Sequence, residues 1–234
     1  MRPLVISHAA CAGHAPENIL AGVRIALRLG ADAVEVDVRA SADGVRVLMH
    51  DPTIDRTTSG SGPVAALTLG QLRALDAGGE AVPTLAEALA LTAGNALLIA
   101  EIKQPGIEEQ VAAVVREARA LNDVMAWSFF PQALEAMRRA EPRLPAALLA
   151  PGETPKWPHF RELALRLGLQ GLGLFHQGIT GETVRQARRS ALALYAWTVD
   201  DESDMRRLIE LGVDGIVTNY PDRALALLST HRRS

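Results

Sequence analysis

Short apolar runs typical of β-strands alternate with longer helical stretches along this chain, and this alternation constrains its fold most. We expect strands at residues 3–8, 33–38, 96–102, 124–129, 145–149, 171–175, 192–199 and 214–218. We expect helices at residues 16–29, 84–93, 107–121, 131–140, 158–167, 180–190, 202–211 and 221–229. Strands that alternate with helices build a parallel sheet. Eight such units in 234 residues predict an α/β fold, a single closed (β/α)8 TIM barrel.

Proline and glycine mark several of the expected helix ends. The string Pro16-Glu17-Asn18 predicts the start of the first helix, with proline near its first position. Gly30, Gly168 and Gly212 each follow a helical run, where glycine commonly ends a helix in the left-handed conformation.

Residues 40–83 interrupt the alternation. The string ASADGVRVLMHD predicts a β-hairpin, because Asp43-Gly44 is a strong signal for a two-residue turn. The stretch from about 52 to 83 is rich in Thr, Ser and Gly, and TLGQLRALDAG within it predicts a short helix. We interpret this stretch as an insertion over the mouth of the barrel, within one domain that spans residues 1–234.

Composition excludes several classes of partner. The net charge of −3 gives no basic surface for nucleic acid. No apolar run approaches the ~18 residues of a membrane span. The start of the chain shows no signal peptide, and a single cysteine suits a reducing compartment. We therefore expect a cytoplasmic protein that acts on a small molecule. Its oligomeric state stays open, a homo-oligomer included.

Acidic and basic side chains lie at the ends of three expected strands. Glu35 and Asp37 are two residues apart on one strand, so they share a face, and Glu101 and Lys103 are related in the same way. His8 and His50 follow neighbouring apolar runs. The carboxyl ends of barrel strands are where such enzymes carry their active sites, which predicts one shared site.

The residue types at this site suit metal-assisted chemistry at phosphorus. Glu35, Asp37 and Glu101 are hard oxygen ligands that favour Mg²⁺ or Ca²⁺ over Zn²⁺. Two histidines can serve as general acid and general base, although the sequence does not assign which is which. Lys103 can hold a phosphate oxygen.

Nine strings, spread in order over nearly the whole chain, resemble the glycerophosphodiester phosphodiesterase family. They are HAPEN, GADAVEVDV, ADGVRVLMHD, DRTTSGSG, VPTLAEAL, EIK, WSF, AWTVDD and LGVDGIVTNYPD. The resemblance implies a TIM barrel with a small insertion after the second strand. It also implies metal-dependent hydrolysis of a glycerophosphodiester to sn-glycerol 3-phosphate and an alcohol. The identity of that alcohol stays open.

The resemblance also implies roles for individual residues. His8 and His50 match the family's catalytic histidines, and Lys103 matches its phosphate-side lysine. Trp197 matches an aromatic residue near the glycerol moiety. The residues that match the family's metal ligands are Glu35, Asp37 and Glu101.

One departure from the family pattern bears directly on phosphate binding. The family usually reads His-Arg-Gly after the first strand, and here the string is His8-Ala9-Ala10. Ala9 cannot replace a bidentate arginine–phosphate contact. His14, in the same loop, is one candidate for a substitute.

Two alternatives follow from the residues. Without the arginine, the chain could be an inactive or redirected barrel that binds a phosphorylated ligand. An enolase-like proton abstraction is disfavoured, because VMAWSFF and PAALLA offer no further carboxylate ligands.

Overall fold

The strands close into a barrel in the computed structural model, which describes residues 2–152 and 157–231. They are β1 (Leu4–Ser7), β2 (Ala33–Ala40), β3 (Arg46–Leu48), β4 (Leu97–Ile102), β5 (Val124–Ser128), β6 (Ala146–Leu149), β7 (Gly171–Phe175), β8 (Ala193–Trp197) and β9 (Gly215–Thr218). All except β3 pair in parallel, in the order β1-β9-β8-β7-β6-β5-β4-β2. A parallel pairing of β1 with β2 closes the ring, so the predicted eight-stranded TIM barrel is confirmed.

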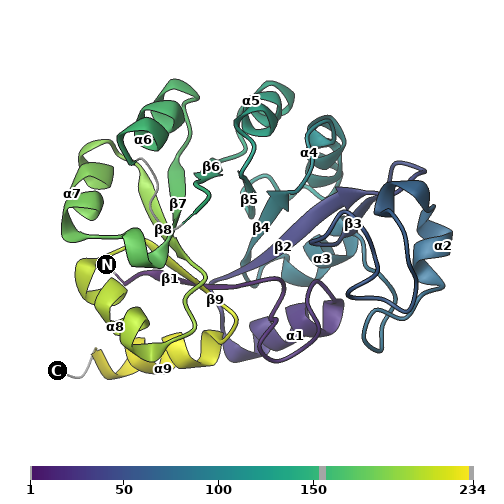
Figure 1. Ribbon diagram of the computed structural model, residues 1–234, viewed down its shortest axis with the longest axis horizontal. Helices are drawn as coiled ribbons and strands as arrows, with labels where there is room; N and C mark the ends of the chain where they lie inside the picture. The colour runs from purple at the N-terminus through teal and green to yellow at the C-terminus, as the bar shows by residue number, and fades with distance from the viewer. Residues whose placement is uncertain (1, 153–156, 232–234) are drawn as a thin grey trace.

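Helices surround the strands, as Figure 1 shows. They are α1 (Leu20–Leu29), α2 (Leu69–Arg73), α3 (Leu85–Thr92), α4 (Glu108–Glu117), α5 (Pro131–Ala140), α6 (Trp157–Arg166), α7 (Gly181–Arg189), α8 (Glu202–Leu211) and α9 (Pro221–His231), with short 3-10 turns η1 (Val64–Ala66) and η2 (His176–Gly178). Gly30 and Gly212 end α1 and α8 in the left-handed conformation, as their positions predicted. Among the described residues, no helix is both long enough and apolar enough to cross a membrane.

Two apolar layers stabilise the barrel. The outer layer lies between the strands and the helices, where alternate strand residues such as Val34, Val36 and Val38 are fully buried. The inner layer fills the barrel, with Ile6, Ile99, Trp127, Tyr195 and Val217 among its members. Because strand side chains alternate between these layers, the residues facing inward at the carboxyl ends are available for a site.

The first helix begins later than the sequence indicated. We expected it to start at residue 16, but α1 starts at Leu20 and residues 16–19 form turns. Asn18 adopts a left-handed backbone (φ 57°), and its backbone N–H donates to the carbonyl of Ala9. A helix cannot include that conformation, so the loop after β1 extends to Ile19.

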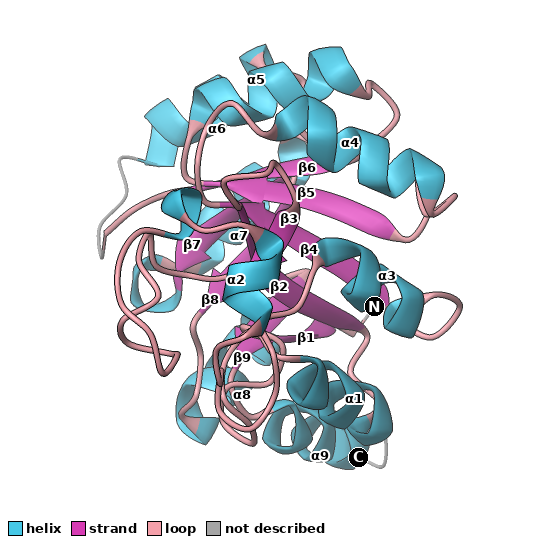
Figure 2. Cartoon of the chain, turned by 90° about the vertical axis from the view of Figure 1, so that its right-hand side faces the viewer, coloured by secondary structure: helices cyan, strands magenta, loops and turns pink. Residues whose placement is uncertain are grey.

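The segment between β3 and α3 packs beside the barrel (Figure 2). Its own apolar cluster, which includes Ile54, Val64 and Leu72, packs against Val47 of β3 and against Ile19. The hairpin is confirmed, but residues 41–45 form its loop because Ala40 pairs with Arg46. None of residues 52–83 lines the pocket, and His50 stands just before them, so the expected position over the mouth stays a prediction.

Candidate active site

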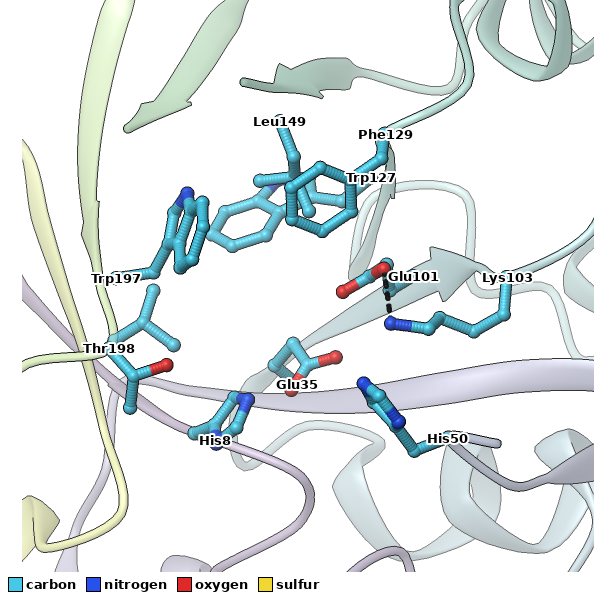
Figure 3. A pocket seen from close by; sticks show the side chains of 11 residues that line it. His8, Glu35, His50, Glu101, Lys103, Trp127, Phe129, Leu149, Trp197 and Thr198 are labelled. Carbon is cyan, nitrogen blue, oxygen red and sulfur yellow. Dashed lines mark hydrogen bonds and ion pairs between the residues drawn. The ribbon is translucent and has the colours of Figure 1, made fainter. Parts of the chain in front are cut away.

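A cavity of about 240 Å³ opens at the carboxyl ends of the strands. Figure 3 shows the side chains that enclose it. They are His8, Glu35, His50, Glu101, Lys103, Trp127, Phe129, Leu149, Trp197, Thr198 and Val217. The side chains predicted from strand ends therefore converge on one pocket, with Asp37 buried beside it at 1% exposure.

Three carboxylates cluster on the polar side of the pocket. Glu35, Asp37 and Glu101 each offer an oxygen, and these oxygens all lie within 4.8 Å of one another. The three residues are buried, and strand pairing aligns Asp37 on β2 with Glu101 on β4. So close an acidic group in a buried position is costly without positive charge nearby.

Each carboxylate is held in place by a neighbour. The amide of Ala9 donates to Glu35 Oε2 at 2.8 Å, and Asn18 Nδ2 donates to Asp37 Oδ2 at 2.7 Å. Lys103 Nζ lies 2.7 Å from Glu101 Oε1 and 3.3 Å from Asp37 Oδ1. Among the described residues, Glu35 Oε1 is buried without any hydrogen-bond partner. An orphaned buried oxygen within a cluster of three carboxylates is the kind of position a cation would satisfy.

The pKa values of the cluster reflect its burial and its crowding. Burial and then the charges of Asp37 and Glu101 raise the pKa of Glu35. Burial, with repulsion from Asp37, raises the pKa of Glu101 to about 7. Burial opposes the charged form of Lys103, but the attraction of Asp37 and Glu101 outweighs it and raises the pKa of this ammonium. Lys103 therefore stays charged and offsets only part of the negative charge.

His8 follows β1 and is oriented by an amide. Its Nδ1 lies 2.8 Å from Asn219 Oδ1, while Asn219 Nδ2 donates to Asp200 Oδ2 at 2.6 Å. A carboxylate only accepts hydrogen bonds, so the asparagine oxygen must face the histidine and accept a hydrogen bond from its Nδ1–H group. The neutral His8 ring therefore carries its proton on Nδ1, which leaves Nε2 with a free lone pair.

His50 follows β3 and is oriented by a carboxylate. Its Nδ1 lies 2.8 Å from Asp51 Oδ1, and Arg56 Nε donates to Asp51 Oδ2 at 2.6 Å. Hydrogen bonds from Arg56 and then from His50 lower the pKa of Asp51 to about 2. Arg39, two residues beyond Asp37 on β2, donates to the carbonyl of His50 from Nε and Nη2 at 3.0 and 2.7 Å.

The opposite wall of the pocket is aromatic and apolar. Phe129 and Trp197 meet edge to face with their ring centroids 5.4 Å apart, and Phe175 packs on Trp197 at 5.7 Å. Lys103 Nζ lies 5.8 Å from the centroid of the Phe129 ring. The pocket thus joins a charged half to an apolar half, which would suit an anionic group attached to an organic residue once a cation offsets the carboxylates.

Two other histidines, one of them the substitute candidate His14, point away from the pocket. His14 Nε2 lies 2.7 Å from Asp222 Oδ1, and its ring packs edge to face on Tyr220. It does not line the pocket, so it is not positioned to replace the family arginine. His176 lies on η2 after β7, where its Nδ1 is 3.4 Å from Asp204. Neither ring is part of the pocket lining.

Ala9 occupies a constrained backbone position. Ala9 and Ala10 both have left-handed backbones, with φ of 45° and 70°, and both are buried. This conformation directs the Ala9 amide at Glu35, so the residue contributes its backbone to the site while its methyl group offers no cation. Consecutive left-handed residues cost roughly 1–2 kcal/mol each, which indicates that the loop is fixed by its surroundings.

Four polar residues of the site were missed as partners from sequence. Asn219 and Asp200 orient His8, Arg56 orients Asp51, and Asn18 orients Asp37. Asn219 and Asp200 each directly follow an expected strand, and that position was a usable signal. Asn18 and Arg56 stand in loops away from the strand ends, so the only signal that marked them was their place in the strings HAPEN and DRTTSGSG.

Comparison with known proteins gives full-length matches. A model described as the Glycerophosphoryl diester phosphodiesterase family matches residues 8–223. A glycerophosphodiester phosphodiesterase from Caldanaerobacter subterraneus subsp. tengcongensis is 36% identical over 243 residues, which cover 97% of this chain and 98% of that protein.

Solved structures agree with that match. A glycerophosphodiester phosphodiesterase from Agrobacterium tumefaciens superimposes with a TM-score of 0.84 at 28% identity, covering 96% of this chain and 99% of the other. A phosphodiesterase from Oleispira antarctica, solved in complex with the product sn-glycerol-3-phosphate, has a TM-score of 0.87 at 28% identity and covers 97% of each chain.

Proposed function

The chain belongs to the glycerophosphoryl diester phosphodiesterase family, and from that premise we propose that it hydrolyses glycerophosphodiesters to sn-glycerol 3-phosphate and an alcohol. The observation that carries this proposal is the convergence of a buried carboxylate cluster, two oriented histidines and one lysine on a single pocket. The product bound in the Oleispira antarctica relative supports the same choice of substrate.

The carboxylate cluster fits a divalent cation. Glu35, Asp37 and Glu101 supply hard oxygen ligands, and the orphaned oxygen of Glu35 lacks any other partner among the described residues. Three protein oxygens leave coordination positions for water and for a phosphate oxygen, as Mg²⁺ or Ca²⁺ requires. When bound, such a cation would neutralise the cluster and polarise the phosphodiester as a Lewis acid.

Lys103 and Trp197 are the residues that we assign to substrate binding. Lys103 lies at the border between the charged half and Phe129, within reach of a phosphate oxygen beside the carboxylates. Its ammonium would stabilise the negative charge that grows on phosphorus-bound oxygens in the transition state. Trp197 lines the apolar half, where it would contact the organic part of the substrate.

The hydrogen bonds of the two histidines suggest how they divide the proton transfers. His8 has a free lone pair on Nε2, so it suits the general base that takes a proton from the attacking hydroxyl, whether of water or of the substrate. His50 faces the carboxylate of Asp51, which would pair with an imidazolium that donates its proton to the leaving alcohol. The new oxygen–phosphorus bond then forms as the bond to the leaving oxygen breaks.

Turnover with metal add-back tests this function. The metal-stripped protein would be given glycerophosphocholine, glycerophosphoethanolamine and bis(p-nitrophenyl) phosphate, followed by Mg²⁺, Mn²⁺ or Ca²⁺. We expect metal-dependent release of glycerol 3-phosphate from the glycerophosphodiesters. A folded protein that binds metal but turns over no diester would overturn the proposal.

The alanine at position 9 favours a second candidate, a barrel that binds a phosphorylated ligand without hydrolysing it. Among the described residues, Lys103 is the cationic side chain of the pocket lining, and neither His14 nor Ala9 adds another. The two oriented histidines argue against this candidate, because simple binding requires no proton transfer. Thermal stabilisation by glycerol 3-phosphate with no turnover of any diester would support it.

A further inference from the structure

Arg56 lies outside the pocket lining yet connects to His50, and we propose that it is a positioning residue for the His50 ring. It would act through Asp51, without contact to the substrate. This inference rests on the proposed function, because it assigns a task to a residue behind the proposed proton donor. The carrying observation is one continuous chain of polar contacts from His50 through Asp51 and Arg56 to Glu17.

Three donors of the Arg56 guanidinium are used in this chain. Its Nε donates to Asp51 Oδ2 at 2.6 Å, and its Nη1 and Nη2 donate to the two oxygens of Glu17 at 2.8 and 2.6 Å. Asp51 then accepts from His50 with its other oxygen, at 2.8 Å. The carboxylate of Asp51 is therefore held from one side by Arg56 and presents its second oxygen to the ring.

The anchor of Arg56 belongs to the loop that also holds the carboxylate cluster. Glu17 precedes Asn18, whose side chain donates to Asp37 and whose side-chain oxygen accepts from the Asp37 amide at 2.9 Å. Arg56 thus bridges two separate segments of the chain, the loop after β1 and the loop after β3. The bridge fixes the His50 ring relative to the carboxylates.

His50 needs such a bridge because little packing holds it. Its side chain is 47% exposed, and that of Arg56 is 52% exposed. Ion pairs at this exposure contribute little to stability. A planar guanidinium, however, imposes direction on several hydrogen bonds at once, which a lysine ammonium does not do. The network therefore suits the positioning of a ring better than the stabilisation of the fold.

Steady-state kinetics of three variants test the inference. We expect Arg56→Gln to lower kcat by roughly 10-fold to 100-fold with little change in KM, since small errors in the placement of a catalytic group cost that much. Arg56→Lys keeps the charge and is expected to recover only part of the loss. Arg73→Gln is the matched control, because it breaks an exposed 2.6 Å contact with Glu87 in the same segment and should leave kcat unchanged.

A double-mutant cycle separates action through Asp51 from an independent role. If Arg56 acts through Asp51, Arg56→Gln adds almost nothing to the loss caused by Asp51→Asn. Fully additive losses would overturn the inference. An Arg56→Gln variant with the same kcat as Arg73→Gln would overturn it too. A raised KM at unchanged kcat would also overturn it, because that result would place Arg56 in contact with the substrate. Should Arg56→Gln fail to fold, Arg56→Lys and Asp51→Asn complete the same cycle.

A nitrogen NMR spectrum of the His50 ring gives a readout that does not depend on turnover. At a pH where the His50 ring is neutral, the wild-type ring is expected to carry its single proton on Nδ1. In Arg56→Gln the neutral ring is expected to be a mixture of the Nδ1 and Nε2 tautomers. A wild-type protein without any diesterase activity would defeat the proposed function and leave this test intact. An unchanged tautomer in Arg56→Gln would defeat the positioning role while the activity stands.

Discussion

The two histidines of this site are oriented by different acceptor atoms, an amide oxygen for His8 and a carboxylate oxygen for His50. His8 donates to an amide oxygen whose own nitrogen is bound to Asp200, so its tautomer is fixed by a neutral group. His50 faces the charged oxygen of Asp51. A carboxylate carries a negative charge that can pair with an imidazolium formed during a reaction, whereas a neutral amide carries none. Under the proposed function, the two histidines would thereby take part in opposite proton transfers.

Alanine at either histidine should nearly abolish the hydrolysis of glycerophosphocholine. We expect kcat to fall by at least roughly 10²-fold for His8→Ala and for His50→Ala, which is the usual contribution of a general acid or base. The variant His159→Ala serves as the control, because this histidine is exposed on α6. Near-wild-type turnover by both pocket variants would contradict the assignment of this pair.

The leaving group should distinguish the two variants. p-Nitrophenolate departs without protonation, so loss of a general acid matters little for a p-nitrophenyl diester. We expect His50→Ala to retain most activity on that substrate and His8→Ala to lose it on both. Equal losses of both variants on both substrates would refute the division of roles.

Removal of one carboxylate should separate metal binding from folding. Glu35→Gln keeps the size of the side chain but replaces the orphaned oxygen and its charge. We expect Mg²⁺ or Ca²⁺ to bind at least roughly 10-fold more weakly, while the metal-free variant is as stable as the wild type or more stable, because a buried repulsion is removed. Calorimetric titration and thermal unfolding measure the two effects. Unchanged affinity would place the cation elsewhere.

Barrel strands position the site only if their inner side chains interdigitate. Gly215 on β9 faces Tyr195 on β8, and a Cβ atom at this position would lie 2.8 Å from Tyr195 Cδ1 and 3.0 Å from Ile6 Cδ1. Tyr195 also packs on Trp127, with their ring centroids 4.8 Å apart. The glycine therefore leaves room for the aromatic layer beneath the pocket.

A methyl group at this glycine should destabilise the barrel. We expect Gly215→Ala to lower the free energy of unfolding by about 1–3 kcal/mol, the usual cost of overpacking a core. The same change in a Tyr195→Ala background should cost much less, since the ring it would meet is gone. Urea unfolding of the four proteins in this cycle measures the difference. Equal costs in both backgrounds would exclude the steric explanation.

The charge of the carboxylate cluster affects the stability of the whole molecule. In the metal-free protein the pKa of Glu101 is raised from 4.5 to about 7, and the pKa of Glu35 is raised as well. Between pH 4.5 and about pH 7, Glu101 therefore holds its proton more often in the folded chain than in the unfolded chain. The contribution of Glu35 and Glu101 to the stability of the metal-free protein therefore falls as the pH rises through this window.

A divalent cation should change this pH dependence. We expect the metal-free wild type to lose stability from about pH 5 to about pH 7.5 relative to Glu101→Gln, which cannot titrate at that position. Because metal binding requires deprotonated ligands, saturating cation should stabilise the protein more at the higher pH. Thermal unfolding at several pH values checks both statements. A metal-free wild type that gains stability over this range relative to Glu101→Gln would contradict them.

The sequence predicted those elements of the fold that a periodic apolar pattern marks. Each of the eight expected core strands is present with its bounds shifted by at most a few residues, because apolar periodicity and strand length are local properties. The start of α1 could not be predicted in the same way. Its loop is set by Asn18, whose left-handed backbone accompanies a contact with a residue 19 positions away.

The sequence by itself determined the barrel and the convergence of Glu35, Asp37 and Glu101, because parallel strands deliver their carboxyl ends to one rim. Tertiary structure alone decided which partners orient those groups. His8 meets Asn219 across 211 positions, and Arg56 meets Glu17 across 39. Such contacts depend on the path of loops in space, which no repeating pattern encodes. The same reason explains why His14 turned to Asp222 and why the insertion packs beside β3.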